Sequence, residues 1–357
     1  MQNIAQTYLD LNQHQIHLPN FPFDLQKINK ITIVACGTSY YAGLCAKYLI
    51  EEIAAVEVEV DIASEFRYRA HPFRDDNLML FISQSGETAD TIAALKYAKT
   101  NKQKILSLVN VPQSSMAQLS DAIIRTVAGP EIGVASTKAY TAQVAVLALF
   151  AIQLAFVKEK IDVTQKNALI QEFADSIHKM IWLFESRNIS NIRKIAGKLY
   201  KSENAIYIGR SISQVTAFEA ALKLRELSYI NTQGIAAGEL KHGTIALIDK
   251  KMPAIVIAPN SKSKRNQLNH LFEKTLSNAE EVKARGGQIV FISDSEGIER
   301  CGEDLARYNI EIPQISGSIQ EAIIPVIVTQ LLAYYIALYL GNDVDQPRNL
   351  AKSVTVE

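Results

Sequence analysis

The chain has 357 residues, which is long enough for two domains that each bury a core of their own. Its 37 lysine and arginine residues balance its 37 aspartate and glutamate residues, so net charge would not draw it to nucleic acid or to an anionic membrane. Its three cysteines form no CxxC pair, which is typical of a reducing compartment, and we expect a cytoplasmic protein.

Residues 1–23 form a lead that lacks the basic start and apolar core of a signal peptide. The one long uncharged run, residues 139–157, is long enough to cross a bilayer. Its two glutamines, Gln143 and Gln153, and its many alanines favour a buried helix instead. We therefore expect no membrane span.

Strand and helix patterns alternate from residue 31 onward. The segment ITIVACGTS (31–39) is an apolar strand that ends in a glycine turn, and a helix through Leu44 and Leu49 follows. The segment NLMLFISQSGE (77–87) repeats this plan before a helix from Thr88 to about Thr100, and KILSLVN (104–110) is a third strand. This alternation predicts a parallel sheet covered by helices.

The same order recurs in the second half of the chain. The segment NAIYIGRSIS (204–213) matches ITIVACGTS with Gly209 in register with Gly37, and two further strand patterns follow it. Each half closes with a long apolar helix, at residues 139–157 and 319–340. We predict an α/β protein built from two copies of one domain. The predicted parts are the lead (1–23), domain 1 (24–163), a helical connector (164–195), domain 2 (196–340) and an irregular tail (341–357).

The loop SQSGET is the first candidate for a binding site. Ligands of open α/β sheets bind at the carboxyl ends of the strands, and a helix N-terminus favours an anion. Ser83, Ser85 and Thr88 could therefore bind phosphate oxygens, with Gly86 allowing the backbone to come close. The alternative is that the polar residues only cap a helix. The chain has neither GxGxxG nor GxxxxGK[ST], so a small phosphorylated metabolite fits better than a nucleotide.

The turn CGTS occupies the equivalent place in the first βα unit. Thr38 and Ser39 could line the same pocket as the SQSGET loop. Cys36 is more typical of a small buried hydrophobe than of a nucleophile, because no basic residue lies near it in the sequence to lower its pKa.

Charged residues in the helix QVTAFEAALKLRELSYI (214–230) leave two interpretations open. Glu219, Lys223 and Glu226 share one helix face. They form either a solvated face with an ordinary Glu–Lys pair or a general base beside a stabilising ammonium.

His242 and Lys352 also have two interpretations each. His242 in LKHG is either a basic residue at a helix end or a proton shuttle. Lys352 is either part of a frayed tail or a lysine that forms a Schiff base with a sugar carbonyl. His14 and His17 lack supporting ligands, so we assign no metal site, and we expect no cofactor.

Several segments together resemble one family. The segments CGTSYYAG, SQSGETADT, EIGVASTKAYT, ALKLRELSYI, AAGELKHG and DVDQPRNLAKSVTVE resemble the isomerase domain of glutamine–fructose-6-phosphate aminotransferases, which consists of two sugar-isomerase (SIS) domains and a tail. The resemblance covers about residues 25–357. It implies conversion of fructose 6-phosphate to glucosamine 6-phosphate.

The resemblance also implies roles for individual residues. Lys352 would form the imine, Glu226 would move the proton between C1 and C2 with Lys223 as its neighbour, and His242 would assist ring opening from the other subunit of a homodimer. The remaining implied substrate-binding and phosphate-binding residues are Thr38, Ser39, Ser83, Gln84, Ser85, Thr88, Val134, Ser136 and Ala351.

The sequence also departs from the family pattern. The family's full chain begins with a glutaminase domain that this chain does not contain, so ammonia would have to come from elsewhere. Thr244 stands where the family usually has proline, and Asn231 and Gln233 stand where histidine and glutamate are common. We expect these changes to alter loop detail only. Two other hypotheses are a stand-alone glucosamine-6-phosphate deaminase and a sugar-phosphate sensor without turnover.

Overall fold

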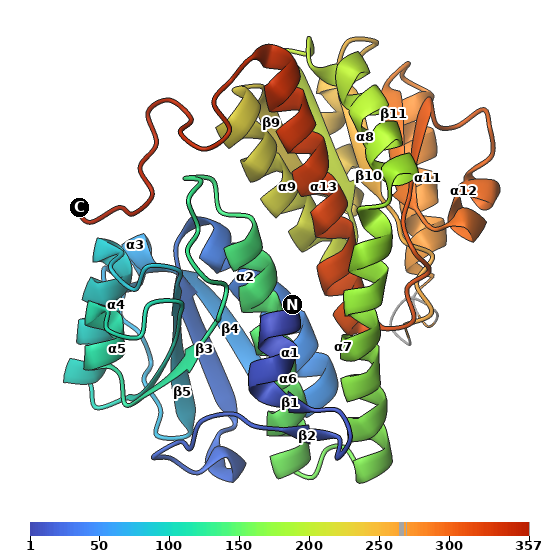
Figure 1. Cartoon of the computed structure of the whole chain (residues 1–357). Helices are drawn as coiled ribbons and strands as arrows, with labels where there is room; N and C mark the ends of the chain where they lie inside the picture. The colour runs from blue at the N-terminus through green and yellow to red at the C-terminus, as the bar shows by residue number, and fades with distance from the viewer. Residues whose placement is uncertain (264–267, 269, 357) are drawn as a thin grey trace. The chain divides into compact units, whose positions relative to one another are not determined.

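The structure is a computed structural model, and it describes residues 1–263, 268 and 270–356 (Figure 1). The chain divides into two compact units. Unit 1 comprises Met1–Ile132, Ser136–Ala174 and Ala351–Glu357, and unit 2 comprises Gly133–Ala135 and Asp175–Leu350. Each unit contains one five-stranded sheet, and every strand pair in both sheets is parallel.

The sheet of unit 1 has the strand order β4-β3-β5-β6-β7. Its strands are β3 (Lys30–Ala35), β4 (Glu57–Ile62), β5 (Asn77–Ser83), β6 (Lys104–Val109) and β7 (Ala122–Arg125). Every residue of β5 is buried, as expected for the apolar central strand of a sheet covered on both faces. The strands predicted near residues 31, 77 and 104 are confirmed, whereas the sequence interpretation did not include the edge strands β4 and β7.

Helices cover both faces of this sheet (Figure 1). One face carries α3 (Ala63–Phe66), α4 (Ala89–Thr100) and α5 (Ser115–Leu119), and the other carries α2 (Gly37–Ala54) and α6 (Lys138–Val157). Buried residues such as Phe66, Phe81 and Leu95 form the core under α3 and α4. The two layers of helices explain why the central strands are apolar on both sides.

The N-terminal lead packs on unit 1. It contains α1 (Gln2–Tyr8), the two-stranded hairpin of β1 (Leu9–Asp10) and β2 (Gln15–Ile16), and the turn η1 (Leu25–Lys27). The Tyr8 hydroxyl donates to the Arg125 carbonyl oxygen at 2.8 Å and accepts from the Arg125 N–H at 3.1 Å. Since β7 is an edge strand, Tyr8 occupies backbone groups that no neighbouring strand pairs with.

Unit 2 repeats the same sheet, with the order β9-β8-β10-β11-β12. Its strands are β8 (Asn204–Gly209), β9 (Asn231–Ala236), β10 (Pro253–Ile257), β11 (Gln288–Ser293) and β12 (Tyr308–Glu311). Its described helices are α8 (Ser186–Leu199), α9 (Ile212–Ser228), η2 (Ala237–His242), η3 (Thr244–Leu247), α11 (Leu271–Lys283), α12 (Ser295–Cys301) and α13 (Ser318–Leu340). The helix α7 (Val163–Leu183) belongs to unit 1 as far as Ala174 and to unit 2 from Asp175.

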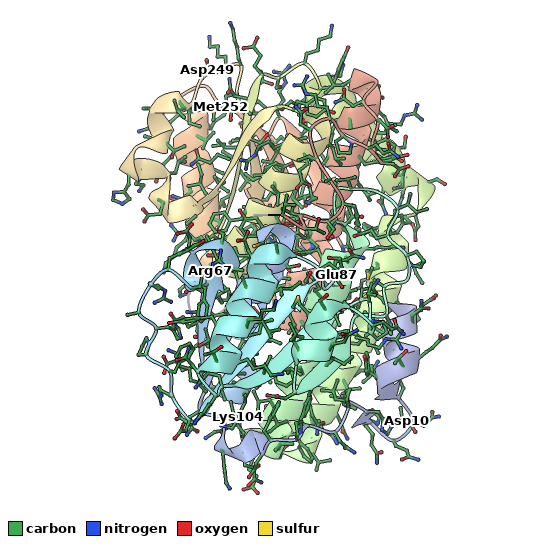
Figure 2. The ribbon with its side chains drawn as sticks, turned by 90° about the vertical axis from the view of Figure 1, so that its left-hand side faces the viewer. Asp10, Arg67, Glu87, Lys104, Asp249 and Met252 are labelled. Carbon is green, nitrogen blue, oxygen red and sulfur yellow. The ribbon has the colours of Figure 1, made fainter. Side chains whose placement is uncertain are left out.

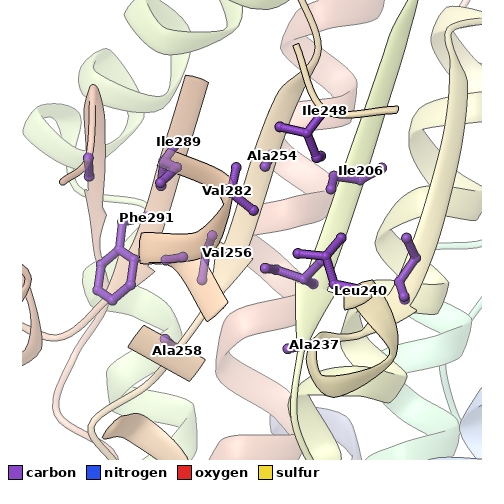
Figure 3. Packing of buried hydrophobic residues seen from close by; sticks show 14 of the residues in the cluster. Ile206, Ala237, Leu240, Ile248, Ala254, Val256, Ala258, Val282, Ile289 and Phe291 are labelled. Atoms are coloured by element: carbon purple, nitrogen blue, oxygen red, sulfur yellow. The ribbon is translucent and has the colours of Figure 1, made fainter. Parts of the chain in front are cut away.

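The core of unit 2 on the side of α11 is a single apolar cluster (Figure 3). Val256 of β10 and Phe291 of β11 pack with Val282 of α11 and Leu240 of η2. This packing positions η2, the element that ends at His242.

The two sheets share one topology, which confirms the predicted duplication. In each, the second strand lies on one side of the first strand and the remaining three lie on the other. The order in which the strands are added to the sheet therefore reverses between β3 and β5 in unit 1 and between β8 and β10 in unit 2. Open α/β sheets bind ligands at the carboxyl ends of the strands beside such a switch point.

Within the part of the chain that the structure describes, two helices are long and apolar enough to cross a bilayer. They are α6 and α13, and 83% and 61% of their most apolar stretches are buried. Burial of this kind is typical of the core helix of a soluble protein. The expectation that residues 139–157 form a buried helix is confirmed.

Candidate active site

The SQSGET loop forms a compact turn between β5 and α4. The buried Ser83 hydroxyl accepts the Gly86 N–H at 3.0 Å, and its oxygen is 3.0 Å from the Thr88 hydroxyl oxygen. The Ser85 hydroxyl accepts the Glu87 N–H at 3.1 Å. Thr88 is the residue before α4, but its side chain makes no capping hydrogen bond, so simple capping does not account for it. The loop therefore gathers hydroxyl groups at a helix N-terminus.

Gly86 is required by the geometry of this loop. Its φ is +70°, a conformation that residues with a side chain rarely adopt. A Cβ atom at this position would lie 2.0 Å from the Ser114 hydroxyl oxygen. Only glycine lets the loop pass this close to the start of α5.

The CGTS turn lies at the same edge of the sheet. Ala35 of β3 pairs with Ile82 of β5, so the loops after these strands are neighbours. Thr38 and Ser39 lie in the first turn of α2, and the Ser39 hydroxyl accepts from the Gln143 side chain at 2.9 Å. The N-termini of α2 and α4 thus follow two neighbouring strands at the carboxyl end of the sheet, a position that favours an anion such as phosphate.

Two other residues complete the description of this edge. The main-chain carbonyl of Gln84 accepts the Asn110 N–H at 3.1 Å, which ties the loop to the end of β6. Cys36 is half-buried, and this burial raises the pKa of its thiol. The thiol form is therefore favoured, in agreement with the prediction that Cys36 is not a nucleophile.

The C-terminal tail is bound to the same loop. The Ser353 and Ser85 hydroxyl oxygens are 3.1 Å apart, and the Val354 carbonyl accepts the N–H of Ala89, the first residue of α4, at 3.0 Å. Lys352 precedes these contacts, and its ammonium nitrogen is 2.5 Å from a carboxylate oxygen of Glu131. The structure thus contradicts the interpretation of residues 352–354 as a frayed end.

Glu131 was not predicted from the sequence. Its Oε1 accepts the N–H groups of Thr137 and Ala139 at 3.0 and 3.1 Å, and its Oε2 accepts from the Ser136 hydroxyl at 3.2 Å. These bonds place a carboxylate at the N-terminus of α6, where the helix dipole stabilises negative charge. The available signal was its position at the start of EIGVASTK, a few residues before an apolar helix.

Two charged residues of α9 in unit 2, Glu219 and Lys223, are buried. The ammonium of Lys223 is 2.5 Å from Glu226 and 3.6 Å from Glu219. The side chains of Lys223 and Glu219 are 1% and 0% exposed, whereas Glu226 is 20% exposed. The interpretation of this face as solvated is therefore wrong. A buried cation between two carboxylates, one of them open to solvent, is typical of functional sites.

Close packing of β9 on α9 encloses this group. Gly234 of β9 lies against the backbone of α9, because a Cβ atom there would be 2.5 Å from the Ala217 carbonyl oxygen. The neighbouring positions Asn231 and Gln233 point to the exposed side of this edge strand, and Asn231 bonds to Asn204 at 2.8 Å. These two departures from the family pattern thus lie on the outer side of β9.

The remaining predicted residues have separate locations. His242 is exposed at the end of η2. Thr244 begins η3 directly after it. Val134 belongs to unit 2, where its N–H donates to the Asp345 carbonyl at 2.8 Å, and Ala351 is an exposed residue of the tail.

One cluster of metal-ligand types lies in unit 1 away from these residues, within the part of the chain that the structure describes. It consists of Glu59, Asp61 and His71. Arg69 binds both carboxylates, and Lys30 binds Glu59 at 2.8 Å. Burial opposes ionisation of Glu59, but the bonds from Lys30 and Arg69 outweigh it and lower the pKa of its carboxyl to about 2. The cluster is an ion-pair network whose acids already have cationic partners.

The described fold and loops agree with known families. A family model described as the SIS domain matches residues 24–153 and 198–340. Among solved structures, the C-terminal domain of glucosamine-fructose-6-phosphate aminotransferase from Francisella tularensis is 38% identical, with a TM-score of 0.86. That match covers 97% of this chain and 94% of the other. The glucosamine-6-phosphate deaminase of Thermotoga maritima shares the fold with a TM-score of 0.68 at 19% identity.

Curated relatives are longer than this chain. A glutamine–fructose-6-phosphate aminotransferase [isomerizing] from Zymomonas mobilis is 48% identical over 352 residues, which cover 99% of this chain and 56% of the relative. A second, from Brucella abortus, is 46% identical over 353 residues, which cover 98% of this chain and 56% of the relative. The chain thus spans little more than half the length of these relatives. It belongs to the SIS-domain family and, within it, to the tandem SIS domains found as the C-terminal domain of glutamine–fructose-6-phosphate aminotransferases.

Proposed function

We propose that this chain is the isomerase domain of a glucosamine-6-phosphate synthase, which converts fructose 6-phosphate and ammonia to glucosamine 6-phosphate. One observation carries the proposal. The tail that bears Lys352 is bound directly to the hydroxyl loop of unit 1, through Ser353 on Ser85 and Val354 on Ala89. A phosphate site and an amine that can react with a carbonyl are thus held together.

The hydroxyl loop would bind the phosphate group of the sugar. Ser83, Ser85 and Thr88 supply hydroxyl groups, and the N-termini of α2 and α4 supply a favourable dipole. Phosphate binding at this end of the sheet would fix one end of an open-chain ketose. Ser39, Gln84, Val134, Ser136 and Ala351 are the further contacts that family membership suggests.

Lys352 would form an imine with the C2 carbonyl of the ketose. The imine makes the C1 proton more acidic, and a carboxylate can then remove it and return a proton at C2. We assign this transfer to Glu226. Its exposed fraction of 20% leaves it accessible, and its bond to the buried Lys223 holds it in one orientation.

Ring opening and ammonia supply complete the proposed reaction. We assign ring opening to His242, supplied by the second subunit of a homodimer, because family membership suggests this role and the histidine is exposed at the end of η2. Ammonia would come from a glutaminase domain, since the curated relatives are nearly twice as long as their match to this chain. We place the reaction in the cytoplasm.

The first test is NMR spectroscopy of fructose 6-phosphate with the purified chain in heavy water, with and without ammonium. Glucose 6-phosphate without ammonium, or glucosamine 6-phosphate with it, is the expected product. Lys352→Ala should lower turnover by about 10⁴-fold or more, since the nucleophile is lost. Lys27→Ala, an exposed lysine of unit 1, is the matched control and should remain active.

Three outcomes separate the hypotheses. Product formed only by chains that retain Lys352 supports the proposal. Bound sugar phosphate without deuterium exchange or product, equally in both lysine variants, would indicate a sensor. Release of ammonia from glucosamine 6-phosphate without measurable synthesis at high ammonium would indicate a deaminase.

A further inference from the structure

The carboxylate of Glu131 is fixed more firmly than an ordinary ion-pair partner. Its side chain is 5% exposed, and one oxygen accepts two backbone N–H groups of the first turn of α6. The other oxygen accepts from the Ser136 hydroxyl and faces the Lys352 ammonium at 2.5 Å. The position of the carboxylate is therefore set by the start of α6 and not by Lys352 alone.

This contact has a chemical consequence for an amine that must attack a carbonyl. An ammonium has no lone pair, so Lys352 must lose a proton before its nitrogen can bond to carbon. The proton needs an acceptor within hydrogen-bond distance of that nitrogen. Oε2 of Glu131 is at this distance in the structure.

We propose that Glu131 is the proton acceptor that activates Lys352 for imine formation, and this role rests on the function proposed above. The Lys352 ammonium transfers a proton to Oε2 of Glu131, and the free amine attacks C2 of the ketose to give a carbinolamine. Protonated Glu131 then returns the proton to the departing C2 hydroxyl. The C–O bond breaks, water leaves, and a protonated imine remains beside the restored carboxylate.

These reaction steps balance in atoms and charge without a further reactant. One ammonium and one carbonyl give one protonated imine and one water, and Glu131 begins and ends as a carboxylate. The arrangement also separates two carboxylate roles, since Glu226 is held by Lys223 and Glu131 by the N-terminus of α6. Glu131 would act on the lysine nitrogen, and Glu226 on the sugar carbon.

Glu131→Gln is the variant that isolates this role. The amide oxygen of glutamine can still accept the Thr137 and Ala139 N–H groups, so the start of α6 keeps its cap. The glutamine amide cannot take a proton from Lys352. Asp10→Asn is the matched control, because one oxygen of the Asp10 carboxylate also accepts two backbone N–H groups, those of Asn12 and Gln13 at 2.9 and 3.0 Å, in the N-terminal lead of the same unit. Figure 2 labels Asp10.

The measurement is the rate of imine formation. Each protein is mixed with fructose 6-phosphate, the imine is reduced with borohydride at timed intervals, and the fraction modified at Lys352 is measured by peptide mass spectrometry. For Glu131→Gln at neutral pH we expect a rate about 10²- to 10⁴-fold lower, the usual contribution of a general base. Sugar-phosphate affinity, measured by calorimetry with a non-reducible analogue that lacks the carbonyl, should stay within about twofold.

The pH profile distinguishes proton transfer from a structural role. With a carboxylate acceptor in place, the rate should change little with pH around neutrality. Without it, the rate should rise about tenfold per pH unit, because the amine must then lose its proton to solvent. A structural role would lower the rate by the same factor at every pH.

Each result has one meaning. A steep profile in Glu131→Gln beside flat profiles in the unmodified chain and Asp10→Asn supports the proposal. Equal rates, or parallel profiles, in all three proteins would overturn the role of Glu131 while leaving the proposed function intact. An unmodified chain that binds the sugar phosphate but forms no adduct would overturn the proposed function itself. Should Glu131→Gln fail to fold, Glu131→Asp, which keeps the charge on a shorter stem, should show a reduced rate with a flat profile.

Discussion

Helices α2 and α9 occupy the same place in the two units, and yet only one of them carries buried charge. Each follows the first strand of its sheet, and the flanking strands set the register, because β3 and β4 align with β8 and β9 when Ala35 is matched to Gly209. In this register the buried Lys223 of α9 corresponds to the buried Leu49 of α2. The two copies of one fold therefore differ most in the chemistry of a shared helix.

An ion pair on the surface of α2 makes the comparison sharper. Lys47 and Glu51 of α2 have the same i, i+4 spacing as Glu219 and Lys223 of α9, and both pairs have an N–O distance of 3.6 Å. The pair in α2 is 40% and 39% exposed, whereas the pair in α9 is 1% and 0% exposed with its charges in the opposite order. The spacing of two charged residues thus does not determine how much their ion pair contributes to stability, because that contribution depends on burial.

The copies also place their binding groups differently. Unit 1 has the loop Ser83–Thr88 after its third strand in space, with hydroxyl groups at the start of α4. The corresponding strand of unit 2, β10, is followed by Ala258, Pro259 and Asn260. The polar groups of unit 1 lie in a loop at the carboxyl end of a central strand, whereas the charged groups of unit 2 lie within helix α9. Under the proposed function, the two copies divide phosphate binding and proton transfer between them.

The largest expected effect tests the helix half of this division. Glu226→Gln should lower turnover of fructose 6-phosphate by about 10²- to 10⁴-fold, because it removes the general base. Sugar-phosphate affinity should change little, since the loop of unit 1 is untouched. Steady-state kinetics and calorimetry measure the two quantities. Glu299→Gln on the exposed face of α12 is the control, and equal turnover in the two variants would contradict the assignment.

The next effect compares the two ion pairs directly. Lys223→Met should lower the free energy of unfolding by about 3–5 kcal/mol, because Glu219 and Glu226 lose the cation between them in a buried place. Lys47→Met in α2 should cost at most about 1 kcal/mol, since that pair is exposed. Chemical denaturation of the two variants measures both values. Equal costs would show that burial does not decide the value of these pairs.

A smaller effect concerns the hydroxyl loop. Gly86→Ala should lower the free energy of unfolding by about 2–4 kcal/mol, through the positive φ and the contact with Ser114. Affinity for a sugar phosphate should fall as well, because the loop must shift. Adding Ser114→Gly should recover the part due to the contact and leave the part due to φ. No recovery in the double variant would mean that φ alone makes this glycine necessary.

The smallest effect concerns the buried His71 of unit 1. The ring of His71 lies 4.7 Å from that of Phe66 and 5.0 Å from that of Phe73. Burial lowers the pKa of the His71 imidazole below its ordinary 6.5, while the charges of Glu59, Arg69, Lys30 and Asp61 act on it in both directions.

The sign of the pH dependence follows from this shift. The unfolded chain binds a proton at His71 at higher pH than the folded chain does, so stability is lost as pH falls below about 6.5. His71→Phe should reduce the drop in melting temperature between pH 7 and pH 5 by about 2 °C. Thermal melts of the unmodified chain and the variant at the two pH values measure this drop, and an unchanged drop in His71→Phe would exclude His71 as its source.

Much of the fold could be predicted from the sequence, because the central strands are continuous apolar runs. The missing strands are all short or partly polar, and they lie at sheet edges. β4 reads EVEVDI, and its exposed and half-buried acids weaken the apolar signal that identified β5. β7 and β12 have four residues each. Edge strands have fewer buried positions, so their sequences contain fewer of the apolar residues by which a strand is recognised.

The candidate site could be predicted only in part. The serines of the SQSGET loop could be predicted as binding residues, because the loop joins the carboxyl end of a strand to the start of a helix. The contact of Lys352 with Glu131 could not be predicted, since 220 residues of intervening chain separate a tail without periodicity from a loop. Burial of Lys223 was equally beyond the sequence pattern, because α2 shows the same spacing in an exposed place.

The bond between Tyr8 and Arg125 has a consequence for the behaviour of the chain in solution. An edge strand with free N–H and C=O groups is a template on which the sheet of another molecule can grow, and proteins avoid this by covering such edges. The Tyr8 hydroxyl occupies both groups of Arg125 at once. The short N-terminal helix thus protects β7 against intermolecular sheet formation. A chain shortened past Tyr8 would keep its catalytic groups but present an open edge for aggregation.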